Sequence, residues 1–438
     1  MMNYVLKNGL AIIDPANNVC ERIDLVVKDG KVYRYNNDTV LNSFEIIDCE
    51  GKIISPGFID VHVHLRDPGF EYKEDIISGS KSAIAGGMTT IFSMPNTVPV
   101  ADNPETIRYI IEKSKNESFT NVFPIASISV GSAGNEVVNF RELINAGAIT
   151  FSDDGKWISD SSVMMEAMRF SSESGIRIIQ HCEDKGIAGD GVINFGTVSK
   201  KFGMPGIPSE SESVAVYRDI SICSLFGAKL HVAHLSLMES MELVAGAKNR
   251  GVDITCEVTP HHLLLDEEMI DKDNADYKVN PPLRSRKDRL SLIDGLKNGL
   301  IDVIATDHAP HSTSEKEAGF MNAPFGMIGL ETAFSLLYTN LVMTGSISLT
   351  ALISKMSQNP AKIFNLRNKG NLFDGSDADI VIIDLNKEYV IEKKHLFSKS
   401  SNTPFHGWKV FGQVTDVFVN GSYIYHNGNF LQKKRVNL

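Results

Sequence analysis

The chain has few cysteines, and their spacing excludes the usual cysteine-based sites. Its 438 residues contain five cysteines, with no Cys-x-x-Cys pair, at positions 20, 49, 182, 223 and 256. An odd number of scattered cysteines is typical of reduced thiols and argues against a disulfide framework. We expect Cys182 and Cys256, which lie in apolar runs, to be small buried side chains.

Long hydrophobic runs and basic clusters are also missing. No stretch approaches the roughly 18 uninterrupted apolar residues of a membrane span, and the first residues lack the basic and apolar segments of a secretory signal. The 43 Lys and Arg against 54 Asp and Glu give a net charge of −11, without basic residues interleaved with aromatics. We therefore expect a cytoplasmic protein that binds no membrane or nucleic acid and acts on a small molecule.

Both ends of the chain have the pattern of short strands separated by turns. Expected strands lie at residues 4–6, 23–27, 31–35 and 45–48, and again at 379–385, 414–419 and 422–426. The turn pairs Asn8-Gly9, Asp29-Gly30 and Glu50-Gly51 are typical of antiparallel hairpins. We expect residues 1–56 and 370–438 to pair as one composite β-sandwich domain.

Between these ends, short apolar strands alternate with segments of helical period. The strands are expected at residues 58–65, 89–94, 122–128, 148–154, 177–182, 229–235, 253–258 and 301–306. The helices are expected at residues 73–86, 104–115, 137–146, 162–174, 213–226, 238–249, 287–298 and 329–341. Successive βα units indicate the α/β class, and eight of them predict a (β/α)8 TIM barrel over residues 57–369.

Two connections in the barrel segment are too long for plain turns. They span residues 183–211 and 309–327, and both follow the carboxyl end of an expected strand. Segments of this kind act as lids over a site or are simply surface loops, and the sequence does not choose between the two.

The first barrel strand ends in His62-Val-His64. Because side chains on a strand alternate with period two, both imidazoles are expected to point the same way and could share a metal ion. The pair alone is a weak signal, since two hydrogen-bonded core histidines would look the same.

Other barrel strands also end in metal-ligand types: Asp153-Asp154, His181, His234 and Asp307. The carboxyl ends of barrel strands converge on one pocket, where each unpartnered polar group would cost a few kcal/mol. Imidazoles and carboxylates suit zinc, and a bridging carboxylate can hold two ions roughly 3.5–4 Å apart. We therefore predict a zinc centre, although period two does not choose between Asp153 and Asp154.

Further polar residues near strand ends are expected to be structural or to support the ligands. They are Asp67, His231, His261 and His262.

The motifs together resemble the dihydroorotases of the amidohydrolase superfamily. They run in the family's order: His62-Val-His-Leu-Arg-Asp-Pro-Gly69, Lys73-Glu-Asp75, Gly86-Gly-Met-Thr-Thr90, Met94-Pro-Asn-Thr97, Phe151-Ser-Asp-Asp-Gly155, His181-Cys-Glu-Asp184, His231-Val-Ala-His234, Val279-Asn-Pro-Pro-Leu-Arg284, Ala305-Thr-Asp-His-Ala-Pro-His311 and Gly329-Leu-Glu-Thr332. The resemblance is to the type with an aspartate in place of a carbamylated lysine. Lys156 lies beyond Gly155, so we expect no such modification.

The resemblance implies a role for each ligand. One Zn²⁺ would take His62, His64 and Asp307, the other would take His181 and His234, and Asp154 would bridge them. One or two ions could be occupied, and two are favoured.

The implied reaction is the reversible cyclisation of N-carbamoyl-L-aspartate to L-dihydroorotate in pyrimidine biosynthesis. The ions would supply hydroxide at neutral pH and polarise the cyclic amide, with Asp307 as the catalytic base and then acid. Arg66, Asn96, Asn280 and His311 would bind the substrate, Arg66 offering its guanidinium to the carboxylate.

Two other functions stay open. The nearest is another cyclic amide hydrolase of this fold, an allantoinase or a hydantoinase, whose ring lacks the carboxylate that Arg66 would bind or holds it differently. The other is an inactive homologue that serves as a scaffold for aspartate transcarbamoylase. The sequence also leaves open a homodimer and an association of the active enzyme with aspartate transcarbamoylase.

Overall fold

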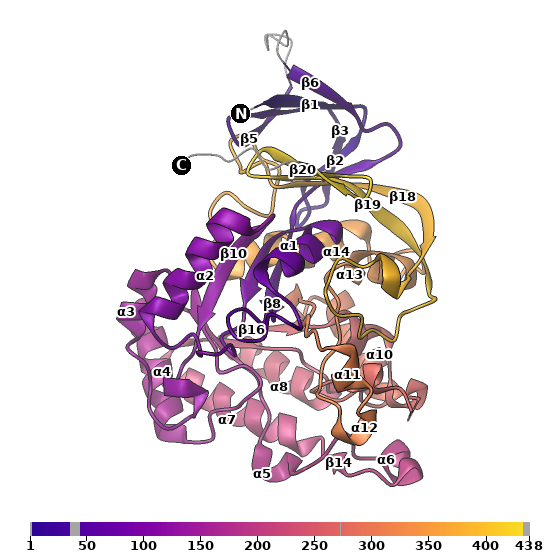
Figure 1. The fold of residues 1–438 in the computed structure, drawn as a ribbon. Helices are drawn as coiled ribbons and strands as arrows, with labels where there is room; N and C mark the ends of the chain where they lie inside the picture. Colours follow the sequence, from indigo (N-terminus) through magenta and orange to yellow (C-terminus); the bar gives the residue numbers. More distant parts are fainter. Residues whose placement is uncertain (1, 36–43, 272, 432–438) are drawn as a thin grey trace.

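The computed structural model describes residues 2–35, 44–271 and 273–431. Figure 1 shows two stacked strand layers, drawn in indigo and yellow, above a larger body in which helices surround a central sheet. In the described part of the chain, no helix is long and apolar enough to cross a membrane.

The larger body is an eight-stranded parallel barrel. Its strands follow the chain in the order β8 (Phe58–Val63), β9 (Met88–Ser93), β10 (Asn121–Ala126), β11 (Thr150–Phe151), β12 (Ile178–Gln180), β15 (Lys229–Val232), β16 (Asp253–Val258) and β17 (Val303–Ile304). The first and last strands meet where Val63 pairs with His308, and the His64 amide donates to the His308 carbonyl at 2.9 Å. The predicted (β/α)8 barrel is therefore confirmed.

Several barrel strands end earlier than the sequence predicts. β11 and β17 pair over only two residues each, and the polar residues expected at their ends lie on the following loops. Arg66, His234 and Asp307 have positive φ angles of 62°, 31° and 48°. L-residues with a positive φ do not have the extended geometry of a strand. The hydrogen bonding between barrel strands therefore ends before these three residues.

The helices cover the outside of the barrel (Figure 1). They are α1 (Ile76–Ala85), α2 (Pro104–Glu117), α3 (Phe140–Ala146), α4 (Ser161–Ser174), α7 (Glu210–Phe226), α8 (Met238–Asn249), α10 (Arg286–Lys297) and α13 (Ala333–Leu337), followed by α14 (Leu349–Met356) and α15 (Gln358–Ile363). The prediction that the last of the eight expected helices begins at residue 329 is wrong. The amides of Gly329 and Leu330 instead donate to His308 Nδ1 at 3.2 and 3.4 Å, which holds this segment as a turn.

The two long connections contain short elements of their own. Residues 183–211 include α5 (Lys185–Ala188), β13 (Ile193–Asn194), α6 (Thr197–Phe202) and β14 (Gly206–Ile207). Residues 309–327 include α11 (Thr313–Lys316) and α12 (Gly319–Asn322). That either connection acts as a lid stays a prediction.

The chain ends form the predicted β-sandwich. One sheet has the order β5-β4-β1-β6, and the other has the order β21-β20-β19-β18-β7-β2-β3. The bounds are β1 (Asn3–Lys7), β2 (Leu10–Asp14), β3 (Val19–Arg22), β4 (Leu25–Lys28), β5 (Lys31–Arg34), β6 (Phe44–Asp48), β7 (Ile53–Pro56), β18 (Ile380–Val390), β19 (Lys409–Val419), β20 (Ser422–His426) and β21 (Asn429–Phe430). C-terminal β18 pairs with N-terminal β7, so one sheet contains both ends of the chain. The domain boundaries at residues 57 and 369 stay a prediction.

The hairpin prediction holds for only one of the three N-terminal turns. Asp29-Gly30 joins the antiparallel strands β4 and β5, as expected. Asn8-Gly9 and Glu50-Gly51 instead carry the chain from one sheet to the other, and β1 pairs with β6 in parallel. A two-layer sandwich needs such crossings, and the turn residues alone do not distinguish them from hairpins.

Residues on both faces of the seven-stranded sheet are buried. Ile380 and Ile382 belong to the core between the two sheets, whereas Val381 and Ile383 belong to the core shared with the barrel helices. The segment between β18 and β19 then runs along the barrel, seen as the yellow trace beside α13 in Figure 1.

Gly86, where α1 ends, permits close packing of α1 against residues 330–331. A Cβ on Gly86 would lie 1.9 Å from the Leu330 carbonyl oxygen. We expect Gly86→Ala to lower the free energy of unfolding by about 1–3 kcal/mol, because backbone must shift to admit the methyl group. Thermal denaturation measures this change.

The matched control is Gly246→Ala inside α8, where the added Cβ would meet only the tip of the Arg250 side chain at 3.4 Å. That change is expected to be neutral or to stabilise by up to about 1 kcal/mol, because alanine is the better helix former. Equal melting temperatures for the two variants would contradict the packing argument.

Candidate metal centre

Two groups of ligand-type side chains meet at the carboxyl end of the barrel. One contains His62, His64 and Asp154, and the other contains Asp154, His181 and His234. All five side chains are buried. Asp154 belongs to both groups and therefore lies between two positions that could each hold an ion.

In the first group, each oxygen of Asp154 faces one imidazole. His62 Nε2 lies 3.2 Å from Asp154 Oδ1, and His64 Nε2 lies 3.3 Å from Oδ2. Asp307 lies beside the first group, with its Oδ1 3.1 Å from His64 Nε2 and 3.5 Å from His62 Nε2. The structure thus brings His62, His64, Asp154 and Asp307 together.

In the second group, two imidazoles approach the same carboxylate oxygen. His181 Nδ1 and His234 Nε2 are 2.9 Å apart, and they lie 3.8 and 3.7 Å from Asp154 Oδ1. Two nitrogens bound to one tetrahedral ion at about 2.0–2.1 Å would be roughly 3.3 Å apart, so this pair is close to ligand spacing.

The unpaired atoms at this centre fit a divalent cation. In the described ranges, His62 Nε2 and Asp154 Oδ1 are buried without a hydrogen bond, although the two atoms lie 3.2 Å apart. Such groups cost free energy unless something binds them. Since the facing donors are imidazole nitrogens and carboxylate oxygens, the residues fit zinc or a similar divalent ion.

The structure shows which of the two neighbouring aspartates faces the histidines, a choice that the alternation of side chains along a strand could not make. Asp153 turns toward the loop after β10, where its Oδ1 accepts from the Ser127 hydroxyl at 2.6 Å and from the Ile128 amide at 2.8 Å. Asp154 is the one that faces the histidines. Lys156 points elsewhere, since its Nζ donates to the Ser132 carbonyl at 3.0 Å.

The carboxylates and imidazoles stabilise one another's charged forms. Burial lowers the pKa of His62, but Asp154, Glu257 and Asp307 outweigh burial and leave this pKa well above its usual value. Burial raises the pKa of Asp154, yet the neighbouring histidines bring it well below the ordinary range. The same opposition lowers the pKa of Asp307 to about 2. The carboxylates are therefore negatively charged at neutral pH, as metal ligands must be.

Hydrogen bonds behind the ligands direct their free nitrogens toward the centre. His62 Nδ1 lies 2.7 Å from Glu257 Oε1, and His64 Nδ1 lies 2.9 Å from Asn96 Oδ1. Both oxygens accept a hydrogen bond from Nδ1, so Nε2 is the ring nitrogen that faces Asp154 and would bind an ion once it has lost its proton. Asn96 thus contacts His64, a candidate ligand. That Asn96 binds the substrate stays a prediction.

Glu257 links three elements of the site. Its Oε2 lies 3.1 Å from His231 Nε2, and the His234 amide donates to its Oε1 at 3.3 Å. The pKa of this fully buried carboxyl is lowered, because His62 and His231 outweigh burial. His231 therefore supports the site through Glu257.

Arg66 and His311 lie side by side at the barrel mouth. Arg66 Nε donates to the Pro310 carbonyl at 3.2 Å, and Arg66 Nη2 lies 3.3 Å from His311 Nε2. Burial, with Arg66 and Lys73, lowers the pKa of His311 to about 2, so its ring is neutral. Arg66 does not lie on a strand, because β8 ends at Val63 and Arg66 sits on a loop with a φ of 62°.

Asn280 lies beside the second group. Its Nδ2 donates to Glu183 Oε2 at 3.0 Å and lies 3.4 Å from His181 Nε2, whereas its buried Oδ1 has no partner among the described residues. The side chain therefore presents a free acceptor near the candidate ligands.

Of the remaining polar candidates, Asp67 and His262 have structural contacts. Asp67 accepts from the Tyr109 hydroxyl at 3.0 Å, and His262 Nε2 donates to the Pro281 carbonyl at 3.0 Å. His261 is buried, and its Nε2 has no hydrogen-bond partner in the described part of the chain. Cys182 and Cys256 are buried and free, as expected for small apolar side chains.

Sequence reasoning missed Glu257 and Glu183. Glu257 lies near the end of β16, between the buried residues Cys256 and Val258, and a carboxylate in a buried part of a strand is a signal that could have identified it. Glu183 follows His181 by two residues, but its contact with Asn280 depends on a loop whose path the sequence does not give.

A family model described as "Dihydro-orotase-like" matches residues 51–240. Among solved structures, an L-hydantoinase (dihydropyrimidinase) from Arthrobacter aurescens has a TM-score of 0.87 at 27% identity, covering 99% of this chain and 98% of that chain. A dihydropyrimidinase from Brevibacillus agri has a TM-score of 0.85 at 25% identity, covering 98% and 96%.

Curated relatives are more similar in sequence. A dihydroorotase from Acetivibrio thermocellus is 46% identical over 420 residues, which are 96% of this chain and 98% of that protein. A dihydroorotase from Brevibacillus brevis is 44% identical over 428 residues, covering 97% of this chain and 100% of that protein. Identity at this level along almost the whole length confirms the resemblance seen in the motifs, and the chain belongs to the dihydroorotase family.

Proposed function

We propose that this protein is a zinc-dependent enzyme that interconverts N-carbamoyl-L-aspartate and L-dihydroorotate, a step of pyrimidine biosynthesis. The proposal includes one or two zinc ions, with two favoured, held by His62, His64, Asp154, His181, His234 and Asp307. A cytoplasmic location, a homodimer and an association with aspartate transcarbamoylase stay predictions.

The observation that carries the proposal is a guanidinium next to a carboxylate–imidazole cluster. Arg66 contacts Pro310 and His311, on the segment that begins just after Asp307. A cyclic amide with a ring carboxylate needs both a place for its amide bond and a cation for its acid group. This chain has both at one mouth of the barrel.

Zinc, when bound, would supply Lewis acidity that polarises a carbonyl and lowers the pKa of water. The side chains of the candidate metal centre would determine where the ions bind. Asp154 would lie between the two ion positions, because its oxygens already face imidazoles of both groups.

Asp307 would move the proton. Its low pKa keeps it a carboxylate at neutral pH, so it can accept a proton when water attacks the cyclic amide. Because Oδ1 faces His64 and His62, we assign the transfer to Oδ2. In ring opening the same oxygen would pass the proton to the departing ring nitrogen.

Arg66, His311, Asn280 and Asn96 would bind the substrate. Lys73 Nζ faces His311 Nδ1 at 3.4 Å, so Nδ1 accepts and Nε2 carries the hydrogen of the neutral ring. In the structure Nε2 donates this hydrogen to the Phe325 carbonyl at 2.9 Å, a bond that the substrate would share or replace. Asn280 Oδ1 would accept from an N–H of the substrate, since it has no partner in the described structure.

An allantoinase or hydantoinase is the alternative activity, because the solved structures of similar fold are hydantoinases. The test is turnover of dihydroorotate, hydantoin and allantoin by one purified sample whose metal content is also measured. Preference for hydantoin or allantoin would overturn the substrate. Absence of turnover together with little zinc would favour an inactive scaffold.

Asp307→Asn should remove most turnover while the protein stays folded. The amide cannot act as the base, and loss of general acid–base catalysis typically costs about 10²–10⁴-fold in rate. Steady-state kinetics and circular dichroism measure the two properties. Asp190→Asn, at an exposed position, is the matched control and should retain activity. A near-normal rate for Asp307→Asn would place the proton transfer elsewhere.

Arg66→Met should raise the KM for dihydroorotate roughly 10- to 100-fold, because a charged hydrogen-bond partner of the carboxylate is lost. Initial rates over a range of dihydroorotate concentrations measure it. Arg286→Met, at the exposed first residue of α10, serves as the control for loss of an arginine. If KM does not change in Arg66→Met, the substrate carboxylate binds elsewhere.

Glu257→Gln should weaken zinc binding about 10- to 100-fold, as expected when the charged acceptor behind a ligand histidine is removed. Competition with a chromogenic chelator measures the zinc dissociation constant without any activity assay. Exposed Glu239→Gln is the control. Unchanged zinc affinity would mean that Glu257 only packs the core.

A further inference from the structure

The loop of residues 309–327 carries His311 and is closed at its base. The Ala309 amide donates to the Met327 carbonyl at 2.9 Å, and His308 pairs with Met327 as an isolated bridge. Gly326 permits this approach, because its φ is +135° and an added Cβ would lie 2.7 Å from the Ala309 Cβ. The two arms of the loop therefore run against each other.

Asn402, from the C-terminal part of the chain, bridges these two arms. Its Nδ2 donates to the carbonyls of Ala309 and Gly326, both at 3.0 Å, and its Oδ1 accepts from the His311 amide at 3.2 Å. The Asn402 carbonyl also accepts from the Ile328 amide at 3.0 Å. Asn402 is only 3% exposed. Both of its amide hydrogens and its side-chain oxygen form hydrogen bonds with this loop.

Only an asparagine-like group satisfies this set of partners. An aspartate would direct oxygens at two carbonyls, and an apolar side chain would leave two carbonyls and one amide without partners. The arrangement fixes the backbone of His311 itself, and not merely the loop in general.

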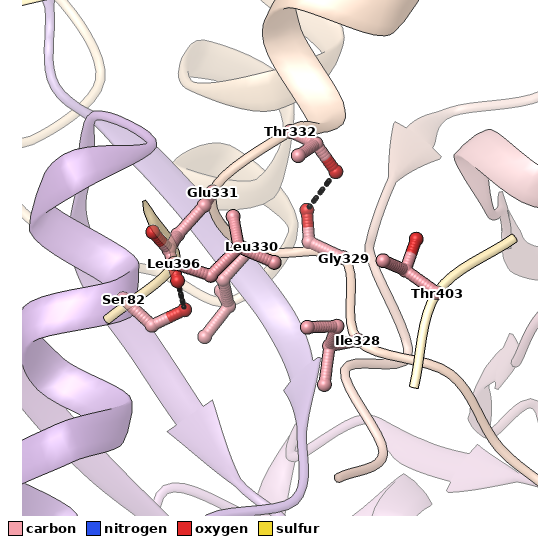
Figure 2. A pocket seen from close by; sticks show the side chains of 8 residues that line it. All are labelled: Ser82, Ile328, Gly329, Leu330, Glu331, Thr332, Leu396 and Thr403. Atoms are coloured by element: carbon pink, nitrogen blue, oxygen red, sulfur yellow. Dashed lines mark hydrogen bonds between the residues drawn. The ribbon is translucent and has the colours of Figure 1, made fainter. Parts of the chain in front are cut away.

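The segment around Asn402 is itself tied to the barrel. The amides of Phe397 and Ser398 donate to Glu331, and the Ser400 hydroxyl donates to the Lys73 carbonyl at 2.8 Å. Figure 2 shows Leu396 and Thr403 of this segment on either side of residues 328–330, and Glu331 bonded to Ser82 of α1. Asn402 is therefore presented from a fixed support.

We propose that Asn402 is a positioning residue for substrate binding: it holds His311 beside Arg66, where the substrate carboxylate would bind. The inference rests on the proposed function for the identity of the substrate. Asn402 does not touch the candidate metal ligands in any contact that the structure gives, so its effect should fall on KM more than on kcat.

The test compares Asn402→Ala and Asn402→Ser with Asn386→Ala, an exposed asparagine of the same C-terminal segment. We expect KM for dihydroorotate to rise about tenfold or more in both Asn402 variants, with kcat changed much less and zinc content unchanged. The Asn386 variant should match the unmodified protein. A fall in kcat at constant KM would overturn the proposal.

A double-mutant cycle isolates the route through His311. In a His311→Ala background, Asn402→Ala should raise KM little further, because the group that it positions is already gone. Additive effects on KM would show that Asn402 acts by another route.

Limited trypsin digestion tests the loop independently of substrate. Lys316 is 8% exposed and its Nζ donates to the Pro324 carbonyl at 2.9 Å, so cleavage after it should be slow in the unmodified protein and faster in the Asn402 variants. Unchanged cleavage at this site would overturn the anchoring role. If both Asn402 variants fail to fold, Asn402 stabilises the whole fold and the proposal is wrong. Lack of dihydroorotate turnover by the unmodified protein would sink the proposed function alone, since cleavage still reports on the anchor.

Discussion

The arrangement of this site depends on one buried carboxylate, Asp154, lying among four imidazoles. A single buried charge is very unfavourable unless opposite charges or hydrogen bonds surround it. His62 and His64 face its two oxygens, and His181 and His234 approach Oδ1, the oxygen that also faces His62. Asp154 and these histidines come from four different barrel strands, so the closure of the barrel brings them to one point.

Most of the candidate ligands lie just beyond the ends of the barrel strands, although His62 lies within β8. His234 and Asp307 leave the extended strand geometry with positive φ angles of 31° and 48°. Such conformations persist only where surrounding contacts fix them. Glu257 supplies part of that restraint, since it contacts the His62 ring and accepts from the His234 amide.

The barrel and its ligand-bearing strand ends could be predicted from the sequence because both follow from local patterns. Apolar strands alternate with helical segments, and ligand types recur at their carboxyl ends. The choice of Asp154 over Asp153 could not be made from period, because it depends on the path of the loop after β10, whose hydroxyl and amide groups bind Asp153. Asn8-Gly9 was misread for a similar reason: a turn sequence does not state whether the next strand joins the same sheet.

Asn402 shows the largest gap between sequence and structure. It is 91 positions from His311 along the chain, yet it binds that residue's amide. No sequence periodicity relates the two residues. They meet because β18 and β19 of the composite sandwich lie beside the barrel and the segment between these strands passes α13. The chain ends therefore do more than cover the barrel. By sharing one sheet they help to place the segment 391–408, and Asn402 of this segment bonds to the loop at the barrel mouth. The pairing of β7 with β18 is thus connected to the loop that we propose to bind the substrate.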